Sequence, residues 1–330
     1  MDRQLAKARP RKGLRAFLYL PRAVCYTVTM KKTLAIFLSL LALGLHAGRV
    51  EVTAENDVVF DNCDEDYTHG TRITYFNDSG WRFGAQQQIY TPDDITLRDQ
   101  VPGRHPYAGA LMGFVGYRDN YLAKGPVSLY NDYELLLGVL GPSALGKETQ
   151  RTIHKWLDCH MPEGWDHQLH DEAIVQGQYF HGLDWRVIGE DKGWSAHLEQ
   201  DAGVLLGTYQ IAAGGSLTLK AGYGFGIGES DHEMYVRSAV RHPFSSVYVL
   251  GGCEGRWWLR NELLDGNAHY VGNHDTLTVD KEPLTGCLKA GVGLRIGGVE
   301  VLAVWMWWSR EYKTQESPAD YGSVRLGVDF

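Results

Sequence analysis

The chain has 330 residues, of which 44% are hydrophobic and 22% are charged, and its formal net charge is −8. Residues 1–47 hold nine Lys or Arg and one Asp, a charge of +8, so residues 48–330 carry −16. A surface this acidic repels nucleic acid, and we expect no nucleic-acid partner.

The first 47 residues are predicted to be a leader that is removed from the mature protein. Met30-Lys31-Lys32 is basic, and the apolar run at 33–45 has 13 residues, fewer than the ~20 that span a membrane. Leu45-His46-Ala47 fits a signal-peptidase site, and residues 1–29 are interpreted as a mis-called start before the signal peptide at 30–47. We therefore expect export, a single domain over residues 48–330, and no transmembrane helix.

An exported protein folds in an oxidising compartment, where cysteines can form disulfides. Four cysteines follow the leader, and their spacing leaves three possible connectivities. They are Cys63, Cys159, Cys253 and Cys287.

Apolar and polar residues alternate with a period of two along most of residues 48–330. Leu217, Leu219, Phe225 and Ile227 fall on one face of a predicted strand, opposite Thr218 and Lys220. Segments of about ten such residues are typical of a transmembrane antiparallel β-barrel. The expected strands, of which some could merge to leave about 12, are 49–57, 69–77, 80–90, 107–118, 127–140, 171–187, 191–208, 213–228, 243–260, 267–280, 284–297, 298–311 and 319–330.

The chain end and the aromatic residues favour the barrel over a soluble β-sandwich, whose strands also alternate. Phe330 closes an alternating strand, as in bacterial outer-membrane proteins. Aromatic residues near strand ends fit the girdles of such a barrel. They are Tyr130, Tyr133, Trp257, Trp258, Trp305, Trp307 and Trp308.

Loop lengths divide the expected barrel into two ends. The turns at Asp78-Ser79-Gly80 and Ile296-Gly297-Gly298 are short and contain glycine, as periplasmic hairpins do. The long insertions 58–68, 91–106 and 141–170 should therefore meet at the extracellular rim. The last of them contains the only good helical pattern.

Polar residues in these insertions could hydrolyse an ester. Gln150 and His154 are four residues apart and would share one face of the predicted helix. His154 could act as a base. Asn56, Asp57 and Thr68 offer the oxygen ligands that calcium prefers, and a bound cation would act as a Lewis acid.

The order of the motifs resembles that of the lipid A 3′-O-deacylases (LpxR type) of Gram-negative outer membranes. The resemblance covers residues 49–175 strongly, and the remainder resembles the family only as barrel strands. The matching motifs are Glu55-Asn56-Asp57, Asp66-Tyr67-Thr68-x-Gly70, Gln87-x-Ile89-Tyr90-x-Pro92, His105-Pro106-Tyr107-Ala108-Gly109, Gly141-Pro142-Ser143-x(2)-Gly146-x(3)-Gln150-x(3)-His154 and Gly164-Trp165-x(2)-Gln168.

The resemblance implies a 12-stranded outer-membrane barrel whose active site lies between the barrel wall and a helix in an outer loop. It implies that His154 activates a water, that Gln150 precedes this base on the helix, and that calcium binds at Asn56, Asp57 and Thr68. The substrate would be lipid A of lipopolysaccharide, among outer-membrane lipids, with the protein as a monomer.

Two features of the resemblance leave residues unassigned. The family places a Glu six residues after the catalytic His, whereas this chain has His160 there, so Glu163 or Asp158 could take that role. A basic residue that assists phosphate binding in the family would be Arg98 or Arg104.

Other readings remain open at this stage. Ser143 lacks the Gly-x-Ser-x-Gly pattern of a nucleophile elbow and fits a helix entry better. Tyr107 and Gly109 could serve only to start a strand and admit a neighbouring backbone. A Cys63–Cys159 disulfide could tie the helix to the first loop. An outer-membrane phospholipase and a non-catalytic porin or adhesin-like barrel are the alternative functions.

Overall fold

The computed structural model describes residues 48–56, 66–190, 193–226, 245–268 and 278–330, so the predicted leader lies outside the described residues. These ranges belong to the second of two units of the chain, His46–Phe330. Its strands are β1 (Gly48–Asn56), β2 (Asp66–Asn77), β3 (Trp81–Thr91), β4 (Ala108–Lys124), β5 (Val127–Leu140), β6 (Glu172–Gly189), β7 (Trp194–Gly207), β8 (Gln210–Tyr223), β9 (Ser246–Asn261), β10 (Leu284–Ile296), β11 (Val299–Trp308) and β12 (Asp320–Asp329). Its helices are η1 (Pro142–Ala144), α2 (Gly146–Leu157), η2 (Trp165–His167) and α3 (Glu262–Asp265).

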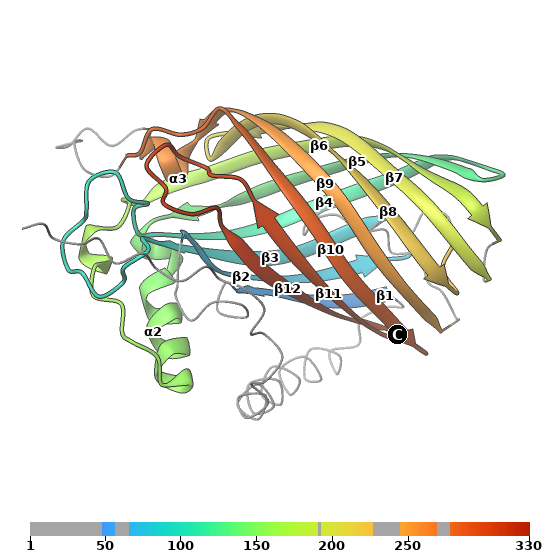
Figure 1. Ribbon diagram of the computed structural model, residues 1–330, viewed down its shortest axis with the longest axis horizontal. Coiled ribbons are helices and arrows are strands. Elements are labelled where there is room, and N and C mark those ends of the chain that lie inside the picture. The colour runs from blue at the N-terminus through green and yellow to red at the C-terminus, as the bar shows by residue number, and fades with distance from the viewer. Residues whose placement is uncertain (1–47, 57–65, 191–192, 227–244, 269–277) are drawn as a thin grey trace, which may run out of the picture. The chain divides into compact units, whose positions relative to one another are not determined.

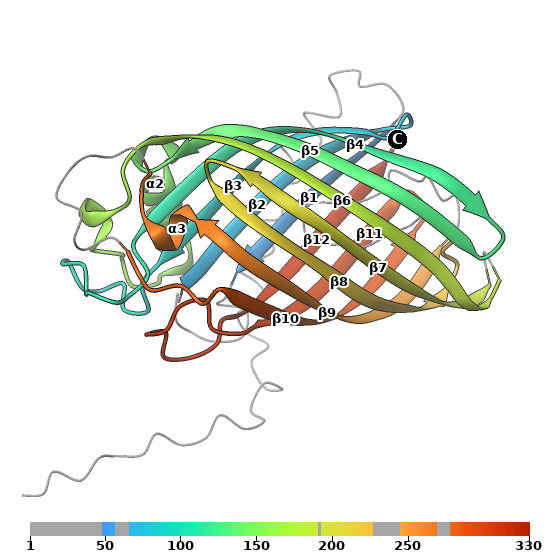
Figure 2. The ribbon, with the colours of Figure 1, turned by 90° about the horizontal axis from the view of Figure 1, so that it is seen from above.

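The twelve strands form a closed antiparallel barrel (Figures 1 and 2). Each strand pairs with the next one in the sequence, and β1 closes the ring by pairing with β12. Val52 of β1 thus lies opposite Ile73 on one side and Leu326 on the other. The predicted fold class is confirmed. None of the helices in the described ranges is long and apolar enough to cross a membrane.

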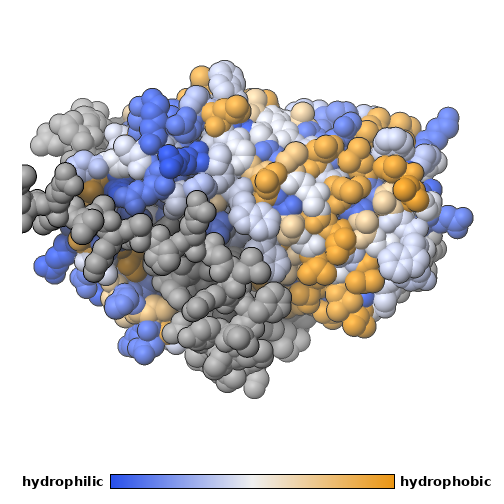
Figure 3. Space-filling view, in the orientation of Figure 1, coloured by the Kyte–Doolittle hydropathy of each residue, from blue (hydrophilic) through white to orange (hydrophobic). Residues whose placement is uncertain are grey.

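The two faces of the barrel wall differ as the alternation predicts. On β8, Leu217 and Leu219 are exposed on the outer surface, whereas Thr218 and Lys220 are buried in the lumen. Figure 3 shows the apolar side chains gathered over the strands and more polar ones toward the loop-bearing end. This distribution matches a barrel that faces lipid outside and polar groups inside.

Several aromatic residues expected in the girdles point into the lumen instead. Trp257 is exposed outside, but its neighbour Trp258 is buried, because adjacent residues of a strand face opposite sides. For the same reason Tyr130 is inside, where the Arg118 guanidinium lies 3.5 Å from the centre of its ring. Trp308 is partly buried against the lumen core. Tyr133, Trp305 and Trp307 are exposed as expected.

Phe225 was also expected on the outer face and is buried inside. Strand β8 ends at Tyr223, and Gly224 has a φ of +84°, so the chain turns inward before Phe225. Its ring packs against Tyr248 and His197 in the lumen. Ile227 lies outside the described residues.

The expected strand at 267–280 is wrong. Strand β9 pairs directly with β10, from Ser246 opposite Arg295 to Trp257 opposite Leu284, which leaves no place between them. Residues 262–265 form α3 instead, and residues 269–277 lie outside the described ranges.

Loops and turns separate the two ends of the barrel as predicted. The turns 78–80 and 297–298 lie at the end where β1 begins and β12 ends, which we call the inner end. The connections 92–107 and 141–171 lie at the opposite, outer end, together with the ends of β1 and β11. Residues 58–65 of the first insertion are outside the described residues.

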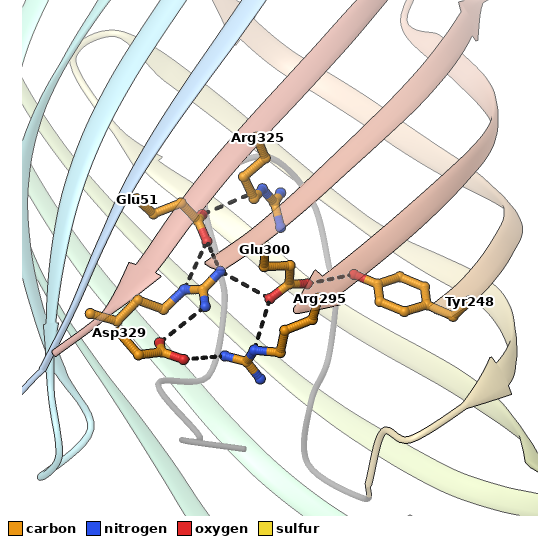
Figure 4. Close-up of polar contacts among 7 residues, drawn as sticks. Glu51, Tyr248, Arg295, Glu300, Arg325 and Asp329 are labelled. Atoms are coloured by element: carbon orange, nitrogen blue, oxygen red, sulfur yellow. Dashed lines mark hydrogen bonds and ion pairs between the residues drawn. The ribbon is translucent and has the colours of Figure 1, made fainter. Parts of the chain in front are cut away.

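Buried ion pairs fill the lumen toward the inner end. One group, the inner ion cluster, joins Arg49 to Glu51 (3.2 Å), Glu300 (3.0 Å) and Asp329 (3.1 Å), and Arg295 to Asp329 (2.7 Å) (Figure 4). The remaining members drawn there are Arg325, 3.4 Å from Glu51, and Tyr248, whose hydroxyl donates to Glu300.

A second group of charges lies across β2, β3 and β5. Arg82 contacts Asp132 (2.6 Å) and Glu134 (2.7 Å), and Arg72 also contacts Glu134 (2.7 Å). All four side chains are almost completely buried. Side chains therefore fill the narrow lumen in this part of the barrel.

Candidate active site

The helix α2 rests on the outward side of the barrel wall. Ala110 and Met112 of β4 face the lumen core. Gly109 directly precedes Ala110 in the same strand, so it faces outward. A Cβ at Gly109 would lie 3.1 Å from both the Cα and the N of Gly146, the first residue of α2. The alternative reading of Gly109, close approach of a neighbouring backbone, is correct.

The ends of α2 are set by two residues in the left-handed conformation. Leu145 precedes the helix with φ 59°, and Asp158 follows it with φ 57°. Such conformations cost a non-glycine residue about 1–2 kcal/mol each. The surrounding contacts must hold them, which ties α2 to one position on the wall.

Gln150 is held on the wall through an aromatic cluster. It is buried in α2, and its Oε1 accepts a 2.7 Å hydrogen bond from the indole Nε1 of Trp165. Trp165 packs against Ile89 of β3 and Tyr107, which precedes β4. Tyr107 therefore does more than start a strand. It forms part of the base on which Gln150 sits.

His154 lies one turn after Gln150 on the same buried face of α2. Its Nδ1 is hydrogen-bonded to the main-chain oxygen of His160. A carbonyl oxygen can only accept, so Nδ1 carries the proton and Nε2 is the basic nitrogen. A general base that used Nε2 would require this tautomer.

The chain has His160 at the position where the family has a Glu, and the contact to His154 comes from this residue. The carboxylates of Asp158 and Glu163 are both exposed, and the orienting contact that the structure gives His154 comes from the backbone of His160. The backbone at position 160 therefore supplies an orienting contact to the imidazole without a carboxylate there.

Asn56 and Thr68 lie together at the outer ends of β1 and β2. The Nδ2 of Asn56 donates to the main-chain oxygen of Thr68 (2.9 Å), and Thr68 Oγ1 is 2.7 Å from Thr91 Oγ1 of β3. A bulge between Tyr67 and His69 interrupts the pairing of β2 with β3 at Thr68. Asp57 lies outside the described residues.

These groups fit a hard cation in type but not in charge. The oxygen atoms of Asn56, Thr68 and Thr91 that could bind a cation are all neutral, and calcium accepts such ligands. No group of three or more His, Cys, Asp or Glu occurs among the residues that the structure describes. A cation here would need Asp57 as its charged ligand.

The two candidate phosphate-binding arginines differ in their surroundings. Arg104 forms ion pairs with Asp93 (2.9 Å) and with Glu316, so it ties the β3–β4 loop to the β11–β12 loop. Arg98 is exposed, and its charge helps to lower the pKa of Asp166, after the larger effect of the hydrogen bond from Lys147. Arg98 is thus the more exposed of the two, and its role in phosphate binding stays a prediction.

Ser143 has a structural role. Its backbone N and Oγ both donate to the carboxylate of Asp171, each at 2.7 Å. The nucleophile reading receives no support from this contact, and the helix-entry reading fits.

The cysteines separate on the two faces of the wall. Cys253 is exposed and Cys287 is buried, so these neighbours on β9 and β10 do not face each other. Cys63 lies outside the described residues, so a bond to Cys159 stays a prediction.

Neighbouring groups at the outer mouth of the lumen hold the β11–β12 loop. Tyr312 and Gln315 both donate to Asp66, at 2.8 and 2.6 Å. His105 is buried beside them, stacked on Tyr90, and burial lowers the pKa of His105 to about 4. Its imidazole is therefore neutral at physiological pH.

Two contributors to the site were missed by reasoning from individual residues. Thr91 pairs with Thr68 across strands, and the signal for it was its place at a strand end directly before Pro92. Trp165 was noticed only as part of a motif, and its bond to Gln150 needed the fold of the loop.

Comparisons with known proteins agree with this architecture. The family model described as "Outer membrane protein LpxR" matches residues 33–330. Among solved structures, LpxR from Salmonella typhimurium is 17% identical with a TM-score of 0.72, and the match covers 86% of this chain and 100% of that one. No curated protein matches the sequence significantly.

Two other outer-membrane barrels are more distantly similar. The β domain of the Bordetella autotransporter BrkA is 12% identical with a TM-score of 0.44, covering 86% of this chain and 100% of that one. The translocator domain of NalP from Neisseria meningitidis is 12% identical with a TM-score of 0.35, covering 93% and 97%.

Proposed function

Because the chain belongs to the LpxR family of outer membrane proteins, we propose that it is an ester hydrolase that removes the 3′-linked acyloxyacyl group from lipid A. The observation that carries the proposal is the position of α2. It holds Gln150 and His154 on a buried face against the outward side of β3 and β4, rather than over the lumen. An ester in the surrounding leaflet could reach that side of the wall.

His154 would be the general base. Its Nε2 takes a proton from water, and the resulting hydroxide adds to the ester carbonyl carbon. When the tetrahedral intermediate collapses, the proton on Nε2 passes to the departing sugar oxygen. The products are the acyloxyacyl carboxylic acid and lipid A with a free 3′-hydroxyl.

A divalent cation, which we propose to be calcium, would be held by Asn56, Asp57 and Thr68 and would stabilise charge on the ester carbonyl oxygen. Around it, this chain's own groups set the geometry. The amide of Asn56 is fixed by its bond to Thr68, and Gln150 is fixed by Trp165. Exposed Arg98 would attract a phosphate of the substrate.

The alternative functions fit the structure less well. A general pore is disfavoured because two groups of buried ion pairs fill the lumen. A serine-dependent phospholipase would need its residues on the lipid side. Ser195 and His197, with Asp184 3.0 Å from His197, are buried inside the barrel.

The test is mass spectrometry of lipid A from cells that express the protein. We expect loss of the 3′ acyl chains with the wild type, and no loss with His154→Ala or with chelator present. His167→Ala, an exposed histidine in the same insertion, is the matched control and should retain activity. Unchanged lipid A in cells that release fatty acids from phospholipid would favour the phospholipase instead.

A further inference from the structure

Helix α2 lies where it can touch the membrane surface. It runs across the barrel axis at the outer end of the barrel (Figure 1). Its first residue, Gly146, contacts the wall at Gly109, on the face that carries the lipid-facing side chains. A helix that leaves the wall sideways at the outer end of a membrane-spanning barrel runs roughly parallel to the plane of the membrane.

One side of α2 carries a row of basic residues. Lys147, Arg151 and Lys155 are spaced four apart and so line up along the helix. Lys147 pairs with Asp166 at 2.8 Å, whereas Arg151 and Lys155 are exposed and form no ion pair within the described part of the chain. Glu148 is the single acidic residue in the helix.

Exposed apolar side chains stand at both ends of α2. Leu145, which directly precedes the helix, is 52% exposed, and Trp156 in the last turn is 55% exposed. Tryptophan is enriched at the boundary between lipid and water, and exposed apolar side chains gather on surfaces that contact membranes.

We propose that α2 is an interfacial helix that docks on the outer leaflet, with Leu145 and Trp156 in the lipid and with Arg151 and Lys155 bound to lipid phosphate groups. Charge complementarity identifies the partner. Residues 48–330 contain 23 basic and 39 acidic residues, so most of the protein repels an anionic surface. The row on α2 is a local exception beside the lipid-facing wall.

This docking surface goes beyond the proposed hydrolysis, because it needs only the outer-membrane location and the phosphates of the leaflet. It is tested in protein that carries His154→Ala, so that no cleavage enters the measurement. The protein in phosphate-free, uncharged detergent micelles is titrated with fluorescent bisphosphorylated lipid A. The same titration is made with lipid A from which the phosphates have been removed.

Replacing Arg151→Glu and Lys155→Glu together should weaken binding of the bisphosphorylated lipid. Each basic residue near an anionic lipid surface strengthens binding about fivefold, so we expect a loss of about 25-fold or more. Binding of the dephosphorylated lipid should not change. The matched control, Arg310→Glu with Lys313→Glu, changes the charge equally at the same end of the barrel and should bind like the parent.

Equal losses for the two lipids, no loss, or an equal loss in the control would each overturn the phosphate assignment. Barrel folding is checked by mobility on unheated gels. If the double Glu variant does not fold, Arg151→Gln with Lys155→Gln must still show a loss confined to the phosphorylated lipid.

The exposed apolar side chains have their own measurement. The fluorescence difference between wild type and Trp156→Phe reports the environment of Trp156. Lipids with a nitroxide near the headgroup should quench it, and aqueous iodide should not. Quenching by iodide alone would overturn the membrane-facing orientation.

Discussion

The contact between Gly109 and Gly146 allows the position of α2 to be tested without touching any polar group of the site. A Cβ at Gly109 would meet two backbone atoms of α2 at 3.1 Å, whereas ordinary contacts begin at 3.4 Å and extend to 4 Å. Alanine therefore requires a shift of about 0.3–0.9 Å, and the extra methyl groups of valine require more. We expect Gly109→Val to move α2 off the wall by about 1 Å.

A displacement of that size matters for catalysis by positioning. Misplacing a catalytic group by 1 Å lowers rates about 100-fold, so Gly109→Val should lower the rate of lipid A 3′-deacylation by about that factor. Gly113→Val is the matched control. Gly113 is on the same strand and the same outward face, but a Cβ there would meet only the oxygen of Gly84, at 3.8 Å.

The assay is the initial rate of acyl release from purified lipid A by refolded protein, with barrel folding checked on unheated gels. We expect Gly113→Val to keep the wild-type rate. The reasoning is refuted if Gly109→Val retains a rate within about threefold of wild type, or if both variants lose activity equally.

Three further predictions concern the lumen, the outer mouth and position 160. Arg82→Ala removes the guanidinium that contacts buried Asp132 and Glu134, and leaves Glu134 with Arg72 as its ion-pair partner. It should lower the free energy of unfolding by about 3–5 kcal/mol in urea titrations, against at most about 1 kcal/mol for the exposed Lys313→Ala. His105 has its pKa lowered from 6.5 to about 4 by burial, so the unfolded chain binds more protons between these values. The stability that this group contributes is present above pH 6.5 and is lost as the pH falls toward 4. His105→Phe should therefore reduce the dependence of the free energy of unfolding on pH between these values. An unchanged dependence in that range would contradict the role given to His105. His160→Ala should hydrolyse lipid A within about twofold of wild type, because the hydrogen bond of His154 goes to the main chain of His160.

The barrel was predictable because apolar and polar residues alternate along most of residues 48–330. Strands with strict alternation, such as β8 and β12, have one face in lipid and one in the lumen, so hydrophobicity alone determines their orientation. One kind of failure occurred where the alternation was read past a strand end, as at Phe225, which follows the turn at Gly224. Another occurred where adjacent aromatic residues were assigned to one face, as at Trp257 and Trp258. The expected strand at 267–280 has no place because β9 pairs directly with β10.

The candidate site was only partly predictable. The shared face of Gln150 and His154 follows from helical spacing and is found in α2. The contacts that hold this face depend on parts of the chain that meet only after folding. Gly109 receives Gly146, and Trp165 reaches Gln150 from the returning loop.

The backbone contact to His154 has a consequence for how this protein can vary. An amide carbonyl neither gains nor loses a proton in any habitable pH range, so its hold on the Nδ1–H of His154 does not depend on the ionisation of a partner side chain. Every amino acid supplies the same carbonyl, so related chains can drift at position 160 while retaining the orienting bond. A search for the partner of His154 by residue type would overlook it, because the partner is specified by the path of the loop.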